Sequence, residues 1–317
     1  MLSQITEKVL SGGKISKNEA MILLDCDLTK LSEMANNIRM KFCGNKIDMC
    51  SIISGRSGNC SENCKFCAQS KYHNTGVEHH GFLDQDIIVE DCKKHFNSGV
   101  HRYSIVTAGR SLNDNDFKKA VSAYGKMKEV CPKIELCASH GLLNYEQFKE
   151  LKKNGVTRYH CNIETSPNYF RKICTTHSFE DKVDTIKAAK KAGLEICSGG
   201  IIGMGENMED RIDMAFVLSD LEVKSIPINI LNPIKNTPLE NVLPLTEEEI
   251  IKTIVIFRYI NPRADIRIAA GRKKISCNGL KAFFAGANAT ITGDFLTTTG
   301  STIKQDKDMF INNGFEI

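Results

Sequence analysis

Three cysteines with a spacing typical of iron–sulfur proteins lie in the first quarter of the sequence. Cys60, Cys64 and Cys67 follow the pattern C-x3-C-x2-C, and the aromatic residue Phe66 precedes the third of them. Iron–sulfur clusters are held mainly by cysteine thiolates. Three thiolates at this spacing can bind three irons of a 4Fe-4S cluster and leave the fourth iron without a protein ligand. The triplet therefore predicts a cluster with one iron open to a small molecule.

A zinc site is the main alternative for these three cysteines. Structural zinc sites combine a C-x2-4-C pair with two further cysteine or histidine ligands. The segment that follows Cys67 offers His73, His79 and His80 but no second cysteine pair. The sequence therefore favours the cluster over zinc.

The triplet resembles the signature of the radical S-adenosylmethionine (SAM) superfamily, in which SAM binds the open iron through its amino and carboxylate groups and is cleaved reductively. The longer segment from Ser57 to Ser70, with Tyr72 and Thr75-Gly76 after it, is similar to the corresponding segment of the biotin synthase family. Further similar segments follow in the order found in that family, and these are Asn162–Pro167, Cys197–Glu206, Pro227–Asn229 and Arg267–Arg272. Together they are far more specific than the triplet alone.

Composition argues against several other classes of protein. The 13 cysteines are odd in number and no apolar N-terminal run precedes a cleavage site, which argues against a secreted disulfide framework and indicates a reducing, cytoplasmic setting. No stretch approaches the ~18 apolar residues that a membrane span requires. The net charge of +4 comes from 42 basic and 38 acidic residues that are interspersed along the chain. Neither a membrane nor a nucleic acid is expected as a partner.

Short apolar, β-branched runs alternate with longer amphipathic stretches, a pattern typical of strand–helix repeats and a parallel sheet. The eight strands expected are Cys50–Arg56, Arg102–Thr107, Lys133–Ala138, Val156–Glu164, Leu194–Ile202, Lys224–Leu231, Ala264–Ala269 and Ala289–Gly293. The helices expected between them include Phe117–Val130, Tyr145–Asn154, Phe179–Ala192, Asp210–Asp220 and Glu247–Tyr259.

These repeats predict an α/β fold, a (β/α)8 barrel of the TIM type formed by residues 50–317, with residues 1–49 as an N-terminal helical extension that caps the barrel base. Such barrels carry their active sites on the loops that follow the carboxyl ends of the strands. Cys60 comes four residues after the expected end of the first strand at Arg56. The triplet is therefore expected at the mouth of the barrel.

Strand alternation directs four further side chains into the barrel. Because successive side chains point to opposite faces of a strand and the helix-facing set should be apolar, Ser104, Cys137, Cys197 and Arg267 are expected to face inward. Barrel interiors are normally filled by branched apolar residues. A single buried cysteine usually behaves as a small hydrophobe, but two inward thiols beside an arginine indicate a second site.

In the family that the chain resembles, the barrel interior holds a 2Fe-2S cluster that is consumed as the sulfur donor, and Cys137, Cys197 and Arg267 match three of its four ligands. Ser104 stands where many members have cysteine. Either its oxygen replaces that thiolate, or the auxiliary cluster is of another type. Cys161, expected on the helix-facing side, and Cys277 could compensate only through a backbone excursion. The remaining cysteines, Cys26, Cys43, Cys50, Cys92, Cys131 and Cys174, are interpreted as structural.

The resemblance also implies a reaction and contacts for its reactants. SAM would yield methionine and a 5'-deoxyadenosyl radical that takes hydrogen from dethiobiotin, the precursor of biotin. Asn162 and Glu164 match residues at the junction of SAM and substrate, and Asn229 matches a substrate contact. Phe66 is expected near the adenine. The glycines expected to let the backbone approach SAM are Gly199, Gly200, Gly203 and Gly205.

Two other functions remain open at this stage. One is a different radical SAM barrel enzyme, such as a lyase or mutase, with no auxiliary cluster. The other is a non-catalytic iron–sulfur or zinc carrier. The partners that the resemblance implies are an external electron donor, an iron–sulfur assembly system that restores the lost sulfur, and a second copy of the chain in a homodimer.

Overall fold

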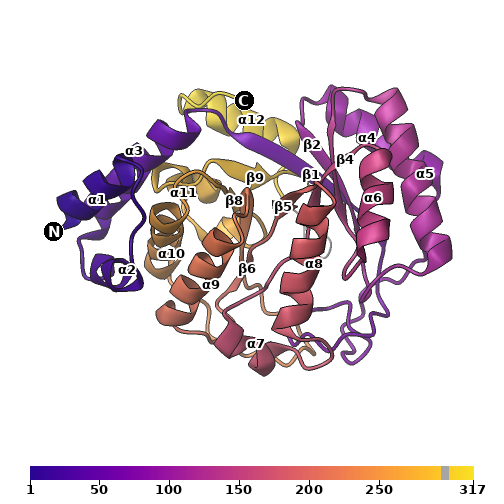
Figure 1. The fold of residues 1–317 in the computed structure, drawn as a ribbon, viewed down its shortest axis with the longest axis horizontal. Coiled ribbons are helices and arrows are strands. Elements are labelled where there is room, and N and C mark those ends of the chain that lie inside the picture. Colours follow the sequence, from indigo (N-terminus) through magenta and orange to yellow (C-terminus); the bar gives the residue numbers. More distant parts are fainter. Residues whose placement is uncertain (294–299) are drawn as a thin grey trace.

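A closed barrel of parallel strands forms the centre of the molecule (Figure 1). The computed structural model describes residues 1–293 and 300–317, so residues 294–299 of the expected barrel segment lie outside the described residues. The strands pair in the order β5-β4-β3-β2-β1-β9-β8-β7-β6, and an additional pairing of β5 with β7 closes the ring. Their bounds are β1 (Asp48–Arg56), β2 (Arg102–Thr107), β3 (Glu135–Ser139), β4 (Val156–His160), β5 (Glu195–Cys197), β6 (Gly200–Ile202), β7 (Ser225–Ile230), β8 (Asp265–Ile268) and β9 (Ala289–Ile291).

The eight-stranded barrel expected from the sequence is confirmed, with β5 and β6 as two pieces of one barrel position. The expected strand Leu194–Ile202 is interrupted because the side chain of Asn162 accepts the Gly199 N–H at 3.0 Å, where a ladder partner would otherwise bind. Strand β4 ends at His160, four residues earlier than expected, and β1 begins at Asp48, two residues earlier than expected.

Helices surround the barrel, and side-chain caps fix where many of them begin. Ser178 at the start of α8 and Thr246 at the start of α10 each form a capping box with the third helical residue. The helices are α1 (Leu2–Leu10), α2 (Lys17–Leu23), α3 (Leu28–Cys43), α4 (Gln85–Asn97), α5 (Asp114–Val130), α6 (Tyr145–Lys153), α7 (Pro167–Ile173), α8 (Phe179–Lys191), α9 (Met208–Asp220), α10 (Glu247–Ile260), α11 (Leu280–Phe284) and α12 (Ile303–Asn312), with short 3-10 turns at η1 (Arg272–Lys274) and η2 (Cys277–Gly279).

The N-terminal extension lies beside the barrel, whereas the sequence had suggested that it caps the barrel base. Helix α3 packs against α10 and α11, and α2 packs against α9 (Figure 1). Only the end of the extension, at Cys43 and Lys46, reaches the base, where a cavity of about 1130 Å³ is also lined by α12 and the C-terminal residues Phe315 and Ile317. Because α3 covers its outer side, α10 is buried along almost its whole length.

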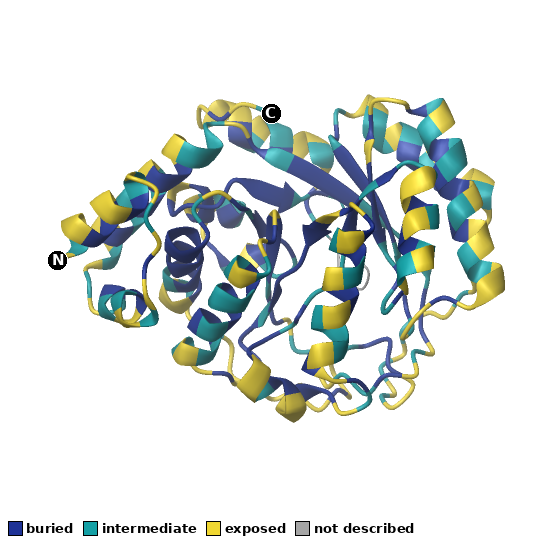
Figure 2. Ribbon diagram, viewed as in Figure 1, coloured by how far each residue is buried: buried dark blue, intermediate teal, exposed yellow. Residues whose placement is uncertain are grey.

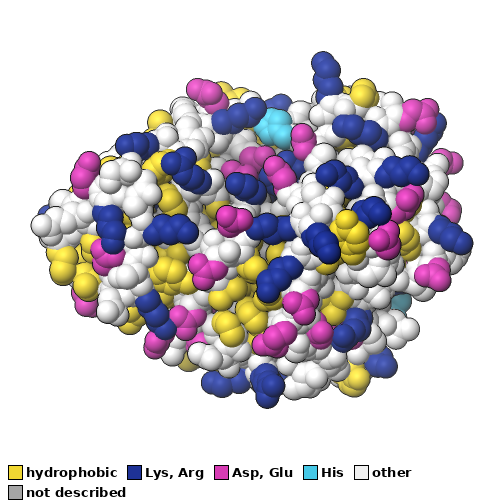
Figure 3. Space-filling model, in the orientation of Figure 1, with side chains coloured by type: hydrophobic (Ala, Val, Ile, Leu, Met, Phe, Trp, Pro, Cys, Tyr) yellow, Lys and Arg dark blue, Asp and Glu magenta, His cyan; other side chains and the backbone are white. Residues whose placement is uncertain are grey.

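Burial and charge follow the layers of the fold. The strands are buried almost throughout, whereas the outer helices expose one face and bury the other (Figure 2). Lysine and arginine side chains are interspersed with acidic ones over the face drawn in Figure 3. In the described part of the chain, no helix combines the length and the apolar character needed to cross a membrane.

Candidate functional site

The cysteine triplet lies on the loop that follows β1, at the carboxyl end of the barrel strands. The loop folds back on itself, because Cys60 donates its N–H to the Gln69 carbonyl at 2.9 Å and accepts the Lys71 N–H at 2.9 Å. Cys60, Cys64 and Cys67 are half-buried, and none of them forms a disulfide. The loop therefore presents three free thiols at the barrel mouth.

The three motif thiols are not gathered as closely as the ligands of a single ion would be. A tetrahedral zinc site holds its thiolates about 3.8 Å apart. Within the described residues, the triplet does not form a group whose ligand atoms all lie within 4.8 Å of one another. The donor set, three thiolates with no fourth from the same loop, also suits a 4Fe-4S cluster with one open iron. The zinc interpretation of the triplet therefore has no support in this geometry.

Asn162 and Glu164 lie just beyond β4, beside the break between β5 and β6. The Asn162 side-chain oxygen accepts hydrogen bonds from His160 Nε2 at 2.8 Å and from the Gly199 N–H. Glu164 has a φ of 69°, which is rare for a residue with a side chain and recurs at functional sites. Burial raises the pKa of its carboxyl group, against the opposing effect of Lys182 on α8. Lys182, which the sequence analysis did not single out, therefore adds a positive charge near this junction.

The four candidate glycines divide into two pairs with different surroundings. Gly199 and Gly200 pack so closely that a Cβ would lie 2.0 Å from the Pro227 carbonyl oxygen and 2.3 Å from that of Glu164, respectively. Gly203 and Gly205 form a turn with positive φ angles of 90° and 100°. The Glu206 carboxylate already accepts the N–H of Gly203 at 2.7 Å. The first pair thus holds two strand ends together, and the second pair shapes the turn before α9.

Adding a methyl group at Gly199 is expected to destabilise the protein. The new Cβ would collide with backbone rather than with a flexible side chain, so Gly199→Ala should lower the free energy of unfolding by about 1–3 kcal/mol. Gly81→Ala is the matched control, because a Cβ there meets nothing within 4 Å, and its effect should stay within about 0.5 kcal/mol. Urea unfolding of the cluster-free proteins measures the free energy of unfolding of both variants. Equal stability of the two variants would contradict the close packing at Gly199.

Phe66 and Asn229 lie at the same end of the barrel but make different contacts. Phe66 packs against a small apolar cluster that includes Met204 and Leu231, beyond β6 and β7. Asn229 lies on β7, where its side chain donates to the Gly200 carbonyl at 3.2 Å and accepts the Ala270 N–H at 3.3 Å. An apolar cluster and an amide side chain thus lie at the neighbouring strands β6 and β7.

Three cysteines share a polar environment inside the barrel, and one of them was missed by the sequence analysis. Of the buried cysteines in the described residues, Cys50, Cys137 and Cys197 are the ones outside the large apolar core. Cys50, which had been interpreted as structural, is the third residue of β1 and pairs with Arg102. Cys50 therefore shares the surroundings of Cys137 and Cys197 outside the large apolar core. The alternation used for the other strands would have placed Cys50 inward, because Met49 on the opposite face is buried in the apolar core.

The three interior thiols influence one another and lie among arginines. Burial, followed by the nearby thiols of Cys197 and Cys50, raises the pKa of Cys137 to about 12, although Arg102 and Arg158 oppose this effect. Burial raises the pKa of Cys50 to about 11, against the opposing charge of Arg267. The thiolates of Cys137 and Cys50 therefore require a positive partner, such as iron, to form inside the barrel.

Arg267 is held in place by an ion pair. Its Nη2 donates to Asp48 Oδ1 at 2.5 Å, its Nε donates to Ser225 Oγ at 3.2 Å, and its Nη1 donates to the Thr290 carbonyl at 2.8 Å. Burial disfavours its charge, but Asp48 and then Cys50 raise the pKa of the guanidinium above its usual value. Arg267 therefore brings a buried positive charge next to the Cys50 thiol.

Unpaired polar atoms around the interior thiols indicate that something polar belongs there. Arg102 Nε, Arg158 Nη1 and Ser104 Oγ are buried without any hydrogen-bond partner in the structure. Such atoms are costly unless a partner binds. Ser104 pairs with Cys137 in the β2–β3 register, so its hydroxyl lies beside a thiol. An anionic iron–sulfur cluster would satisfy these N–H donors and use the thiols as ligands, so the residues present fit an auxiliary cluster.

Cys161 and Cys277 do not share this interior. Cys161 belongs to the large apolar core, and the charged side chain that influences it most is Lys182 on α8, so it faces the helices. Cys277 is exposed in the η2 turn. Neither residue lies among the interior thiols, whereas Cys50 is near enough to Cys137 to influence its thiol.

Two family models match the chain. Residues 56–218 match the model of the radical SAM superfamily. Residues 227–316 match the model described as the biotin and thiamin synthesis associated domain. Together the two matches cover the barrel from the end of β1 to the C-terminal region, and only residues 219–226 lie between them.

Curated relatives match along the full length. The chain is 54% identical over 317 residues to a biotin synthase from Alkaliphilus metalliredigens, covering 100% of this chain and 99% of the relative. It is 55% identical over 317 residues to a biotin synthase from Clostridium beijerinckii, covering 100% of both.

Solved structures with low sequence identity share the fold. Methylornithine synthase superposes with a TM-score of 0.85 at 20% identity, covering 98% of this chain and 96% of that one. The FeFe-hydrogenase maturase from Carboxydothermus hydrogenoformans superposes with a TM-score of 0.83 at 17% identity, covering 99% and 78%, respectively. These likenesses concern the barrel architecture alone.

Proposed function

The chain belongs to the biotin synthase family of radical SAM, sulfur-inserting enzymes, and from that membership we propose that the sulfur it inserts into dethiobiotin comes from an auxiliary iron–sulfur cluster held by Cys50, Cys137 and Cys197. The observation that carries the proposal is the group of three buried thiols outside the apolar core, with unpaired guanidinium N–H groups beside them. A lyase or mutase without an auxiliary cluster would leave both features unused.

The motif cysteines and the interior cysteines have separate tasks. When bound, a 4Fe-4S cluster on Cys60, Cys64 and Cys67 supplies the electron that cleaves SAM, and the auxiliary cluster supplies the sulfur atom. Unreactive C–H bonds lie beyond general acid–base groups, so a cofactor has to carry that step. The side chains of the protein therefore bind and orient the clusters and the two reactants, and they exclude water from the site.

The residues at the barrel mouth suit the two organic reactants. Phe66 and its apolar neighbours offer a flat surface for the adenine of SAM, while Gly199 and Gly200 leave no side chain between the strand ends. The cyclic urea of dethiobiotin carries N–H donors and a carbonyl acceptor, which the amide side chains of Asn162 and Asn229 can match. Their present backbone partners would be exchanged for the substrate.

Arg267 has a supporting electrostatic role in this proposal. Because the Asp48 carboxylate favours the protonated guanidinium, Arg267 would stabilise the negative charge of the thiolates and sulfides. Arg102 and Arg158 add further positive charge around the same thiols. With three thiolates as ligands, the fourth ligand position is left to Ser104 or to a non-protein ligand. This ligand set suits a 2Fe-2S cluster or a larger variant. An external electron donor, an iron–sulfur assembly system and a homodimer complete the proposed setting.

Incubation of the reduced protein with SAM and dethiobiotin should produce biotin, methionine and 5'-deoxyadenosine. The single measurement that tests this is product analysis by mass spectrometry under anaerobic conditions, with iron and sulfide analysis of the same sample. Cleavage of SAM without biotin, from protein that contains a single cluster, would support the lyase alternative and overturn the proposal.

A further inference from the structure

We propose that Cys64, Cys174 and His177 form a binding site for one thiophilic divalent cation, such as Zn²⁺, in protein that lacks the 4Fe-4S cluster. Cys174 ends α7 and His177 lies in the turn before α8, more than 100 residues along the chain from Cys64. The proposed reaction gives no role to Cys174 or His177. The shared use of Cys64 rests on the proposed function, but the cation site itself does not.

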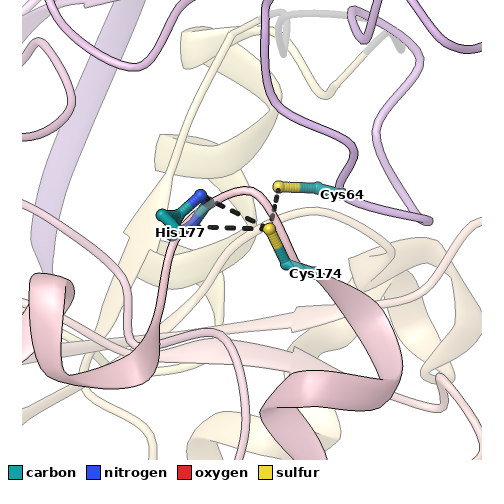
Figure 4. Close-up of side chains that lie close together, drawn as sticks. All are labelled: Cys64, Cys174 and His177. Carbon is teal, nitrogen blue, oxygen red and sulfur yellow. Dashed lines mark hydrogen bonds between the residues drawn. The ribbon is translucent and has the colours of Figure 1, made fainter.

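The distances between the three side chains match those of a tetrahedral metal site. Cys64 Sγ lies 3.7 Å from Cys174 Sγ, and Cys174 Sγ lies 3.3 Å from Nδ1 and 3.8 Å from Nε2 of His177 (Figure 4). With Zn–S and Zn–N bonds of about 2.3 and 2.0 Å, a tetrahedral ion separates two thiolates by about 3.8 Å and a thiolate and an imidazole nitrogen by about 3.5 Å. Among the described residues, ligand atoms from this group all lie within 4.8 Å of one another.

Glu62 orients the histidine in the manner that metal sites commonly use. Its Oε2 accepts a hydrogen bond from His177 Nδ1 at 2.6 Å and another from Thr176 Oγ1 at 2.9 Å. With Nδ1 engaged, Nε2 is the nitrogen left for the cation. A carboxylate on the far nitrogen fixes the tautomer and raises the basicity of a histidine ligand.

Hydrogen bonds hold the loop that carries Cys64 against the segment that carries Cys174 and His177 without any bound ion. The Asn63 side-chain oxygen accepts the N–H of Thr175 at 2.9 Å, and Lys65 donates its N–H to the Ile173 carbonyl at 2.9 Å. Cys174 and His177 are buried, with exposures of 3% and 8%, while Cys64 is half-buried. The ligands are therefore preorganised, and a water molecule would complete the tetrahedron as the fourth ligand.

Occupation of this site and assembly of the 4Fe-4S cluster exclude each other. The Cys64 thiolate cannot bind an iron of the cluster while it is held toward Cys174 and His177. A thiophilic cation bound here would therefore block cluster assembly, and removing Cys174 would relieve the block without removing a cluster ligand.

Titration of cluster-free protein with Co²⁺ tests the site directly, because tetrahedral thiolate coordination gives Co²⁺ intense visible bands. All proteins carry Cys137→Ala, so that the interior thiols do not compete. The parent should bind a single equivalent that Zn²⁺ displaces. Cys174→Ala should lose the bands and Cys67→Ala should keep them, while Glu62→Gln should weaken binding about 10–100-fold. Circular dichroism checks that each variant is folded.

The second measurement is the rate at which iron and sulfide rebuild the 4Fe-4S cluster with and without Zn²⁺. Zinc should slow assembly in the parent and leave Cys174→Ala unaffected. The proposal is overturned if Cys174→Ala binds Co²⁺ as the parent does, or if Cys67→Ala loses the bands. Failure of any protein to assemble a 4Fe-4S cluster would instead count against the proposed function, because the Co²⁺ result does not depend on it.

Discussion

Replacing Cys60, Cys64 or Cys67 with alanine is expected to abolish the formation of 5'-deoxyadenosine from SAM in the reduced protein. Each thiol sits on the one loop that follows β1 and is accessible at the barrel mouth. A 4Fe-4S cluster with an open iron needs all three thiolates, because the loop offers no fourth cysteine that could replace a lost ligand. The loss should therefore be complete for each single variant, and chromatography of the nucleoside product measures it.

Cys26→Ala provides the control for this loss. Cys26 lies between α2 and α3, in the N-terminal extension that packs on the outer helices, so its variant should cleave SAM like the unaltered protein. Retained cleavage in all three motif variants would show that the triplet does not hold the cluster. A drop in Cys26→Ala of similar size would show that the assay reports general damage.

The barrel could be predicted because its signals are local. Each strand is a short β-branched run, and most helices begin at a side-chain cap, so periodicity alone locates them to within a few residues. The break between β5 and β6 could not be found in this way. It arises because the Gly199 N–H donates to the side-chain oxygen of Asn162 and not to a carbonyl of a neighbouring strand. Helix α7 was also missed, because its seven residues are too few to show a helical period.

In the candidate site, too, the features that depend on neighbouring residues could be predicted, and those that depend on distant segments could not. The motif loop was evident because its three cysteines are adjacent in sequence. The closeness of Cys64 to Cys174 depends on how the loop after β1 lies against the end of α7, and nothing in either segment signals the other. Cys50 was missed for a different reason. It was the first residue of the expected strand, whereas β1 begins at Asp48, so Met49, whose burial in the apolar core indicates that Cys50 faces inward, was left outside the expected strand.

Replacing Cys50 with alanine is expected to separate the two halves of the reaction. The variant should still cleave SAM, because Cys50 lies in the barrel interior and not on the motif loop, but it should lose biotin formation. Two interior thiolates would remain, and metal affinity follows the number and softness of the ligands. The loss of biotin should exceed the ~10–100-fold effect seen when a residue that only orients a metal ligand is removed. Product analysis and iron content of the same samples measure both halves.

Mössbauer spectra of matched variants show whether the loss comes from the auxiliary cluster. The interior signal should disappear in Cys50→Ala and in the near-isosteric Cys50→Ser, and it should change in Ser104→Cys, which adds a thiol beside Cys137. Cys161→Ala and Cys277→Ala should leave it unchanged, because one side chain faces α8 and the other is exposed. An unaltered interior signal in both Cys50 variants would mean that Cys137 and Cys197 suffice as thiolate ligands. A loss in Cys161→Ala would mean that β4 turns its helix-facing side inward when the cluster assembles.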